Sequence, residues 1–107
     1  MEFVSMDLAM QYMMNYRSVF DKVKDSFLES YQNYEKDYQN FLEEKDYQKL
    51  DYYIQSIKGI SLNLGAKLLY DASLLAIVSI ENKAYDEKSL NIFFDVLGKT
   101  YKELKSL

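Results

Sequence analysis

The residues with the clearest chemical character lie on one short stretch of the chain. Asp51, Gln55, Lys58, Gly59 and Leu62 recur at spacings of three and four, which places them on one face of a helix. Gln55 carries a polar carboxamide, Lys58 adds a cation one turn later, and Gly59 leaves bare backbone beside both. Glycine inside a helix costs about 1 kcal/mol relative to alanine, so its presence needs a reason. We therefore expect Gln55 to project outward into solvent, with Lys58 and the bare backbone of Gly59 beside it.

Covalent chemistry at this face is limited by what the chain lacks. It contains no histidine and no cysteine, so it has neither the commonest general base and phosphoacceptor nor a thiolate. The lone pair of a carboxamide nitrogen is delocalised, so Gln55 cannot accept a phosphoryl group. The acidic cluster of Glu43, Glu44 and Asp46 indicates a solvated face, because a di-metal bundle site needs Glu-x-x-His pairs. We therefore expect no enzyme, no catalytic residue, no metal site and no cofactor.

The composition narrows the class of protein further. The 107 residues predict a single domain, 1–107, and the net charge of −4 argues against nucleic acid as a partner. No run of about 18 apolar residues is present, so we expect no membrane insertion. The first residues lack the basic region and cleavage site of a signal peptide, which favours a cytoplasmic location.

The elements that must position this face are predicted to be helices. The chain has no proline, only three glycines, and many Leu, Lys, Glu and Tyr residues. Apolar residues recur at helical spacing in five segments. The first is a short helix over 5–16 with an apolar stripe of Met6, Met10, Met13 and Met14, and the second is a single helix of about 25 residues spanning Phe20 to Phe41. The third is capped by Asp46 and stops near Asn63 and Gly65. The fourth runs from Ala66 to about Asn82, and the fifth is capped by Asp86 or Ser89. The predicted fold is all-α, an antiparallel four-helix bundle with an additional short N-terminal helix.

Residues 54–69, with the sequence IQSIKGISLNLGAKLL, resemble the signature of histidine phosphotransfer (HPt) domains, which relay phosphoryl groups in two-component signalling. In that signature the pattern is His-x-Leu-Lys-Gly-x-Ser, followed by a glycine and a hydrophobic pair. The positions that match or replace it are Gln55 on the His, Ile57 on the Leu, Lys58, Gly59, Ser61, Gly65 and Leu68. Upstream, the family's Asp-x-x-x-Leu and Leu-x-x-Phe regions are matched by Asp46 with Leu50 and by Phe27-Leu28 with Tyr31. The resemblance covers the chain from about residue 18 to its end.

The resemblance implies a fold, a partner and a site. The fold is the HPt-like four-helix bundle, and the partner is the receiver domain of a response regulator or of a hybrid histidine kinase. The docking residues are Asp51, Gln55, Lys58, Gly59 and Leu62, with Ile60 at the edge. Gln55 takes the phosphoacceptor position, so the implied protein is a pseudo-HPt module that docks on receivers without accepting phosphate. Plants use such proteins as competitors in phosphorelays.

Other interpretations stay open from the sequence. The chain is a genuine phosphotransfer protein if Gln55 replaces a natural histidine, or a helical scaffold if the partner has been lost. Gly59 alone fits a close helix crossing as well as a docking surface. Ser61 fits a small core residue bonded to a carbonyl one turn earlier, and Gly65 fits a helix stop. The receiver, the pathway, the organism and the oligomeric state are not specified.

Overall fold

The computed structural model describes residues 1–82 and 86–107, and within these residues the chain is all-helical, with no strand. This confirms the predicted all-α class. The elements in chain order are α1 (Met6–Tyr12), α2 (Arg17–Ser30), α3 (Tyr34–Glu44), α4 (Tyr47–Ser61), the 3-10 turn η1 (Leu62–Leu64), α5 (Lys67–Glu81) and α6 (Glu87–Lys105). None of the helices in the described ranges is long and apolar enough to cross a membrane.

The helix ends fall where the capping residues predicted them. The Asp46 carboxylate accepts a hydrogen bond from the Lys49 N–H at 3.1 Å and begins α4. Asp86 begins α6 in the same way, accepting from the Lys88 N–H at 3.0 Å. Such caps satisfy backbone donors that the first turn leaves unpaired. Gly65 ends η1 with a φ of +71°, the left-handed conformation expected of a helix stop.

The single helix predicted over 20–41 is wrong, because the chain turns between α2 and α3. Tyr31 ends α2, and the Tyr34 N–H donates to the Tyr31 carbonyl at 3.1 Å across the turn. Both helices keep their aromatic stripe on the core side, with Phe27 buried in α2 and Phe41 buried in α3. After the three-residue turn, the aromatic stripe of α3 faces the core as the stripe of α2 does. The spacing of the hydrophobic residues is therefore nearly unchanged across the turn, and the pattern predicted one helix.

The helix predicted over 5–16 is shorter than expected. α1 ends at Tyr12, and Met14 and Asn15 adopt left-handed backbone with φ of 52° and 64°. Met6, Met10 and Met13 pack against the core as predicted, but Met14 is 77% exposed and does not join the stripe. Two consecutive left-handed residues are incompatible with a continuing right-handed helix.

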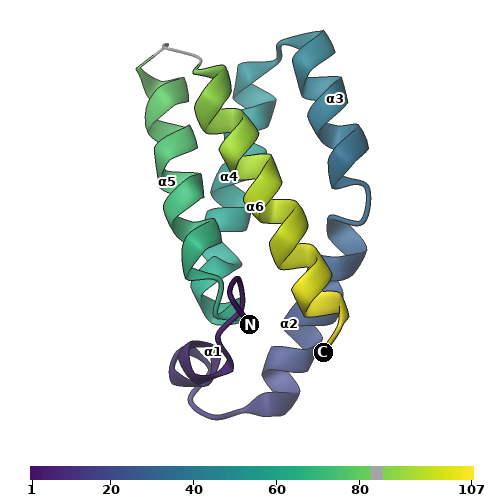
Figure 1. The fold of residues 1–107 in the computed structure, drawn as a ribbon, viewed down its shortest axis with the longest axis vertical. Coiled ribbons are helices and arrows are strands. Elements are labelled where there is room, and N and C mark those ends of the chain that lie inside the picture. Colours follow the sequence, from purple (N-terminus) through teal and green to yellow (C-terminus); the bar gives the residue numbers. More distant parts are fainter. Residues whose placement is uncertain (83–85) are drawn as a thin grey trace.

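The longer helices lie side by side around one core (Figure 1). α5 packs against α4 and α6, α3 packs against α6, and α1 lies across the lower end against η1. The fully buried side chains at the centre form one continuous cluster that includes Phe20, Phe27, Ile54, Ile57, Leu69, Phe93 and Leu97. Burying each such side chain stabilises the fold by about 1.5–3 kcal/mol.

Contacts between aromatic rings pack α2 and α3 against α4 and α6. The rings in contact, which we name the aromatic row, are Tyr31, Tyr38, Phe41, Tyr53 and Phe94. Tyr38 stacks on Phe94 with centroids 4.3 Å apart, and the Tyr53 hydroxyl donates to the Asp37 carboxylate at 3.0 Å. Burial, followed by the nearby Asp37 charge, raises the pKa of Tyr53 far above its ordinary value. The tyrosines of the aromatic row therefore pack against the hydrophobic core.

Candidate functional site

Helix α4 carries the candidate site, and burial of its inner face sets its rotation about the helix axis. Leu50, Ile54, Ile57 and Ser61 are buried on that face. The Ser61 hydroxyl donates to the Ile57 carbonyl one turn earlier at 2.7 Å. This confirms the predicted role of Ser61 as a small core residue. Because the inner face is fixed, the residues between these positions are held towards the surface or the flanks.

One flank of α4 is covered by α2 and α3. Tyr53 contacts the rings of Tyr31 and Phe41 with centroids 5.4 and 5.2 Å away. Ile60, two turns later on the same side, lines a cleft of about 480 Å³ with Val23 and Phe27 of α2. Ile60, which the sequence placed at the edge of the docking residues, thus faces the α2 side of the helix.

By their helical spacing, the five predicted docking residues lie on the side of α4 away from Tyr53 and Ile60. We call Asp51, Gln55, Lys58, Gly59 and Leu62 the docking face. Gly59 is exposed and the other four side chains are partly buried. Gln55 was predicted to project into solvent, but its side chain is partly buried. Leu62 begins η1 and keeps helical backbone, with φ −68° and ψ −33°.

Gly59 is the glycine that internal packing does not explain. Apart from its two chain neighbours and the backbone of its own helix, no heavy atom of the described residues lies within 4 Å of a Cβ atom added at residue 59. A Cβ at residue 98 would lie 2.9 Å from the Tyr34 ring, and one at residue 65 would collide with the Ser5 carbonyl. The close helix crossing considered from the sequence therefore does not account for Gly59, and the bare backbone there faces open space.

The two charged members of the docking face differ in their surroundings. Lys58 is partly buried and makes no ion pair with any of the residues that the structure describes. The Oδ1 oxygen of Asp51 is buried and has no hydrogen-bond partner among the described residues. A buried acceptor without a donor costs about 1–3 kcal/mol. Lys58 therefore offers a cation without an internal partner, whereas the buried Asp51 oxygen is out of reach of one.

The N-terminal segment holds the lower end of the site, which the sequence did not indicate. The Ser5 N–H donates to the Gly65 carbonyl at 2.9 Å, and Val4 is buried. The N–H groups of Glu2 and Phe3 donate to the Glu103 carboxylate at 3.1 and 2.8 Å. The five residues before α1 are too few to show a period, so only the small size of Gly65 could have signalled this contact.

The chain has no histidine and no cysteine, so neither side chain contributes chemistry at this face. No group of three or more acidic side chains in the described ranges is placed to hold a metal ion. Glu43, Glu44 and Asp46 are exposed, as predicted for a solvated face. Comparison of the chain with protein-family models, with curated proteins and with solved structures found no significant match.

Proposed function

We propose that the protein is an HPt-like signalling module that docks on receiver domains without accepting their phosphate. In this proposal α2 with α3, α4, α5 and α6 form an HPt-like antiparallel four-helix bundle, with α1 as the additional short helix. The partner is the receiver domain of a response regulator or of a hybrid histidine kinase in the cytoplasm. The observation that carries the proposal is the open space at Gly59, an exposed residue in the last turn of α4.

Glycine at residue 59 is unfavourable for the helix itself. A glycine in the interior of α4 lowers helix stability by about 1 kcal/mol relative to alanine. No neighbouring atom in the described structure requires its small size. A partner that must approach the backbone at this position supplies the requirement that the fold does not. Lys58, which has no internal ion pair, stands beside this position to meet an acidic site on the partner.

The absence of phosphate transfer follows from Gln55. A phosphoacceptor needs a nucleophilic lone pair, and the amide nitrogen of Gln55 does not have one. The docking face includes no other free nitrogen nucleophile, because the ammonium group of Lys58 has no lone pair. A module of this kind competes with active phosphotransfer proteins for a receiver, and so lowers the flow of phosphoryl groups through it.

The proposal is tested by titrating the protein against receiver domains of the same organism in a calorimeter. Each receiver is measured bare and with beryllofluoride, which mimics its phosphorylated state. We expect saturable binding that Gly59→Gln weakens by about tenfold or more, because the new side chain fills the centre of the interface. Ser18→Gln, which places the same side chain at an exposed site on α2, should leave the affinity unchanged.

Two outcomes would count against the proposal. If no receiver binds, the protein is better described as a helical scaffold. If a receiver binds and Gly59→Gln binds equally well, the docking face is elsewhere. Circular dichroism of Gly59→Gln separates a blocked interface from a misfolded variant, and unchanged helix content is expected because nothing surrounds residue 59.

A further inference from the structure

Glu103 is placed against the electrostatic preference of its own helix. It lies in the last turn of α6, where the helix end carries partial negative charge and the other charged residues are Lys102 and Lys105. A carboxylate in this turn is unfavourable unless donors compensate it. The N-terminal segment supplies such donors, because the N–H groups of Glu2 and Phe3 each bind one oxygen of the Glu103 carboxylate, at 3.1 and 2.8 Å. Glu103 is therefore suited to holding that segment.

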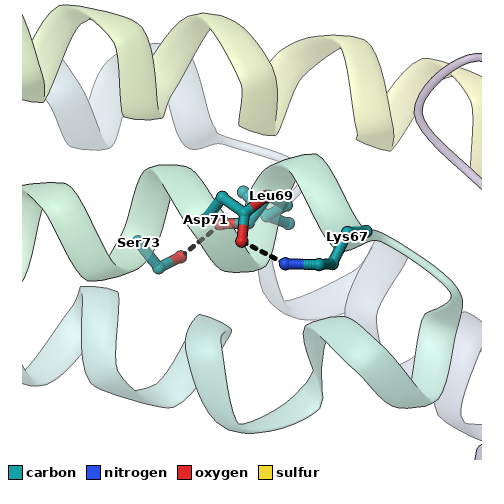
Figure 2. A network of polar contacts seen from close by, with 4 residues as sticks. All are labelled: Lys67, Leu69, Asp71 and Ser73. Atoms are coloured by element: carbon teal, nitrogen blue, oxygen red, sulfur yellow. Dashed lines mark hydrogen bonds and ion pairs between the residues drawn. The ribbon is translucent and has the colours of Figure 1, made fainter.

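This contact differs from the ion pairs on the surface of the described residues. Each of the three ion pairs joins two side chains one turn apart in the same helix, as Lys67 and Asp71 do in α5 (Figure 2). The Glu103 carboxylate instead binds residues 100 and 101 positions away along the chain. The Lys99 ammonium, one turn before Glu103, lies 5.7 Å from the centre of the Phe3 ring. The end of α6 thus holds the N-terminal segment at two places.

Residues 2–5, which we call the N-terminal strap, connect the end of α6 to the end of η1. The Ser5 N–H donates to the Gly65 carbonyl at 2.9 Å, and the Gly65 N–H in turn donates to the Leu62 carbonyl at 2.9 Å. Leu62 begins η1 and belongs to the docking face. The strap therefore links Glu103 to the lower end of the docking face.

The strap has little buried surface of its own. Val4 is its one buried side chain, and Phe3 is partly buried. α1 is anchored separately, because Ala9 is fully buried and Met6 and Met10 pack against the core. Segments with few buried apolar contacts open without unfolding of the rest of a protein.

We propose that the N-terminal strap opens and closes independently of the helical bundle, that the Glu103 carboxylate holds it closed, and that the closed strap supports the docking face. In the closed state the strap fixes Gly65, and with it the turn that begins at Leu62. In the open state the Gly65 carbonyl loses its donor from Ser5, and η1 loosens. The effect on a receiver rests on the proposed function, whereas the opening itself does not.

Amide hydrogen exchange of the full chain, followed by NMR, tests the role of Glu103. In the original chain the Phe3 and Ser5 amides should exchange more slowly than in an unstructured peptide. Glu103→Ala removes both acceptor oxygens and should accelerate exchange at Phe3 and Ser5 by about tenfold or more, whereas the buried Leu97 should keep its rate. Glu103→Gln keeps one acceptor oxygen and should give intermediate rates.

Glu81→Ala is the matched control. Glu81 is an exposed glutamate at the last residue of α5 and makes no ion pair with any described residue, so its removal should leave Phe3 and Ser5 unchanged. Unprotected strap amides in the original chain, or unchanged rates in Glu103→Ala, would overturn the role of Glu103. Acceleration of Leu97 in step with Ser5 would show that the strap opens only with the whole bundle, and would overturn independent opening.

A second pair of measurements tests the support of the docking face. The Gly65 amide, which bonds to the Leu62 carbonyl, should also exchange faster in Glu103→Ala. The affinity of that variant for a receiver should fall by about fivefold, whereas Glu81→Ala should bind as the original chain does. Faster exchange at Ser5 with an unchanged Gly65 rate, or with unchanged receiver affinity, would overturn the coupling. If the original chain binds no receiver, the proposed function fails, and the exchange rates still decide whether the strap opens and loosens η1.

Discussion

The Ser5 N–H donates a hydrogen bond to the Gly65 carbonyl at 2.9 Å, and the Ser5 carbonyl lies where a side chain on residue 65 would begin. The N-terminal segment thus closes over the end of η1, immediately after the helix that carries the docking face. Gly65 has two reasons to be glycine, its φ of +71° and this contact. Gly59 has neither a positive φ nor a neighbour that an added side chain would displace, so the two glycines can be compared directly.

Alanine substitutions at the two glycines should have opposite effects on stability. Gly59→Ala should raise the free energy of unfolding by about 0.5–1 kcal/mol, because it removes the helix penalty of glycine and meets open space. Gly65→Ala should lower it by about 2 kcal/mol or more, through left-handed strain and displacement of Ser5. Urea unfolding followed by circular dichroism measures both. A loss of stability in Gly59→Ala would mean that internal packing does require the glycine.

Gln55→His tests whether the docking face retains the geometry of a phosphotransfer site. Imidazole restores the nucleophilic nitrogen that the carboxamide lacks. The variant should therefore take labelled phosphate from a phosphorylated receiver, whereas Gln55→Asn should not. The chain has no other histidine, so any acid-labile label on the variant reports residue 55 alone. A folded Gln55→His protein that binds the receiver and stays unlabelled would show that the reacting geometry has been lost.

Lys58 should contribute to receiver affinity through its charge. Lys58→Gln is expected to weaken binding by about twofold to fivefold, the range of a partly exposed ion pair, and to reduce its dependence on salt. Lys36→Gln changes the same charge at an exposed position of α3 and is the control. Equal effects of the two variants would assign the result to net charge and not to a contact at Lys58.

The stability of the fold should fall at alkaline pH because of Tyr53. Burial and Asp37 raise its pKa in the folded protein, while the unfolded chain titrates near the ordinary value of about 10. Above about pH 10 the unfolded chain therefore releases a proton that the folded protein keeps, and unfolding becomes more favourable as pH rises. Tyr53→Phe should be less stable near neutrality by about 1 kcal/mol, through loss of its hydrogen bond. It should also lose stability less steeply between pH 9 and pH 11, which urea unfolding across that range measures; an unchanged slope would place the alkaline sensitivity in other tyrosines.

Capping and periodicity were sufficient to predict much of the fold. Asp46 and Asp86 mark helix starts through a local interaction with the next turn, so their sequence context is enough. The break after Tyr31 was missed because the turn keeps the aromatic stripe in phase, and the choice between one helix and two depends on contacts with α4 and α6. Those contacts, such as Tyr31 with Tyr53, join residues far apart in the chain.

The candidate site was only partly predictable for a related reason. Helical spacing predicted that Asp51, Gln55, Lys58 and Gly59 share one side of a helix, but it could not tell how far each side chain would be covered. Ile60 lines the cleft beside α2 and Gln55 is partly buried, and both depend on where the neighbouring helices pack. The surroundings of Gly59 could not be predicted either, since the sequence alone does not distinguish a glycine that permits a close helix crossing from one that faces open space.

The aromatic row gives the protein an intrinsic optical signal for these experiments. The chain has no tryptophan, so its ultraviolet fluorescence comes from tyrosine alone. The Tyr53 hydroxyl donates a hydrogen bond to the Asp37 carboxylate, and the Tyr53 ring lies against the rings of Tyr31 and Phe41. Both contacts quench tyrosine emission. Opening of the contact between α3 and α4 should therefore appear as brighter emission. The same rings that hold the bundle together report its unfolding without any attached dye.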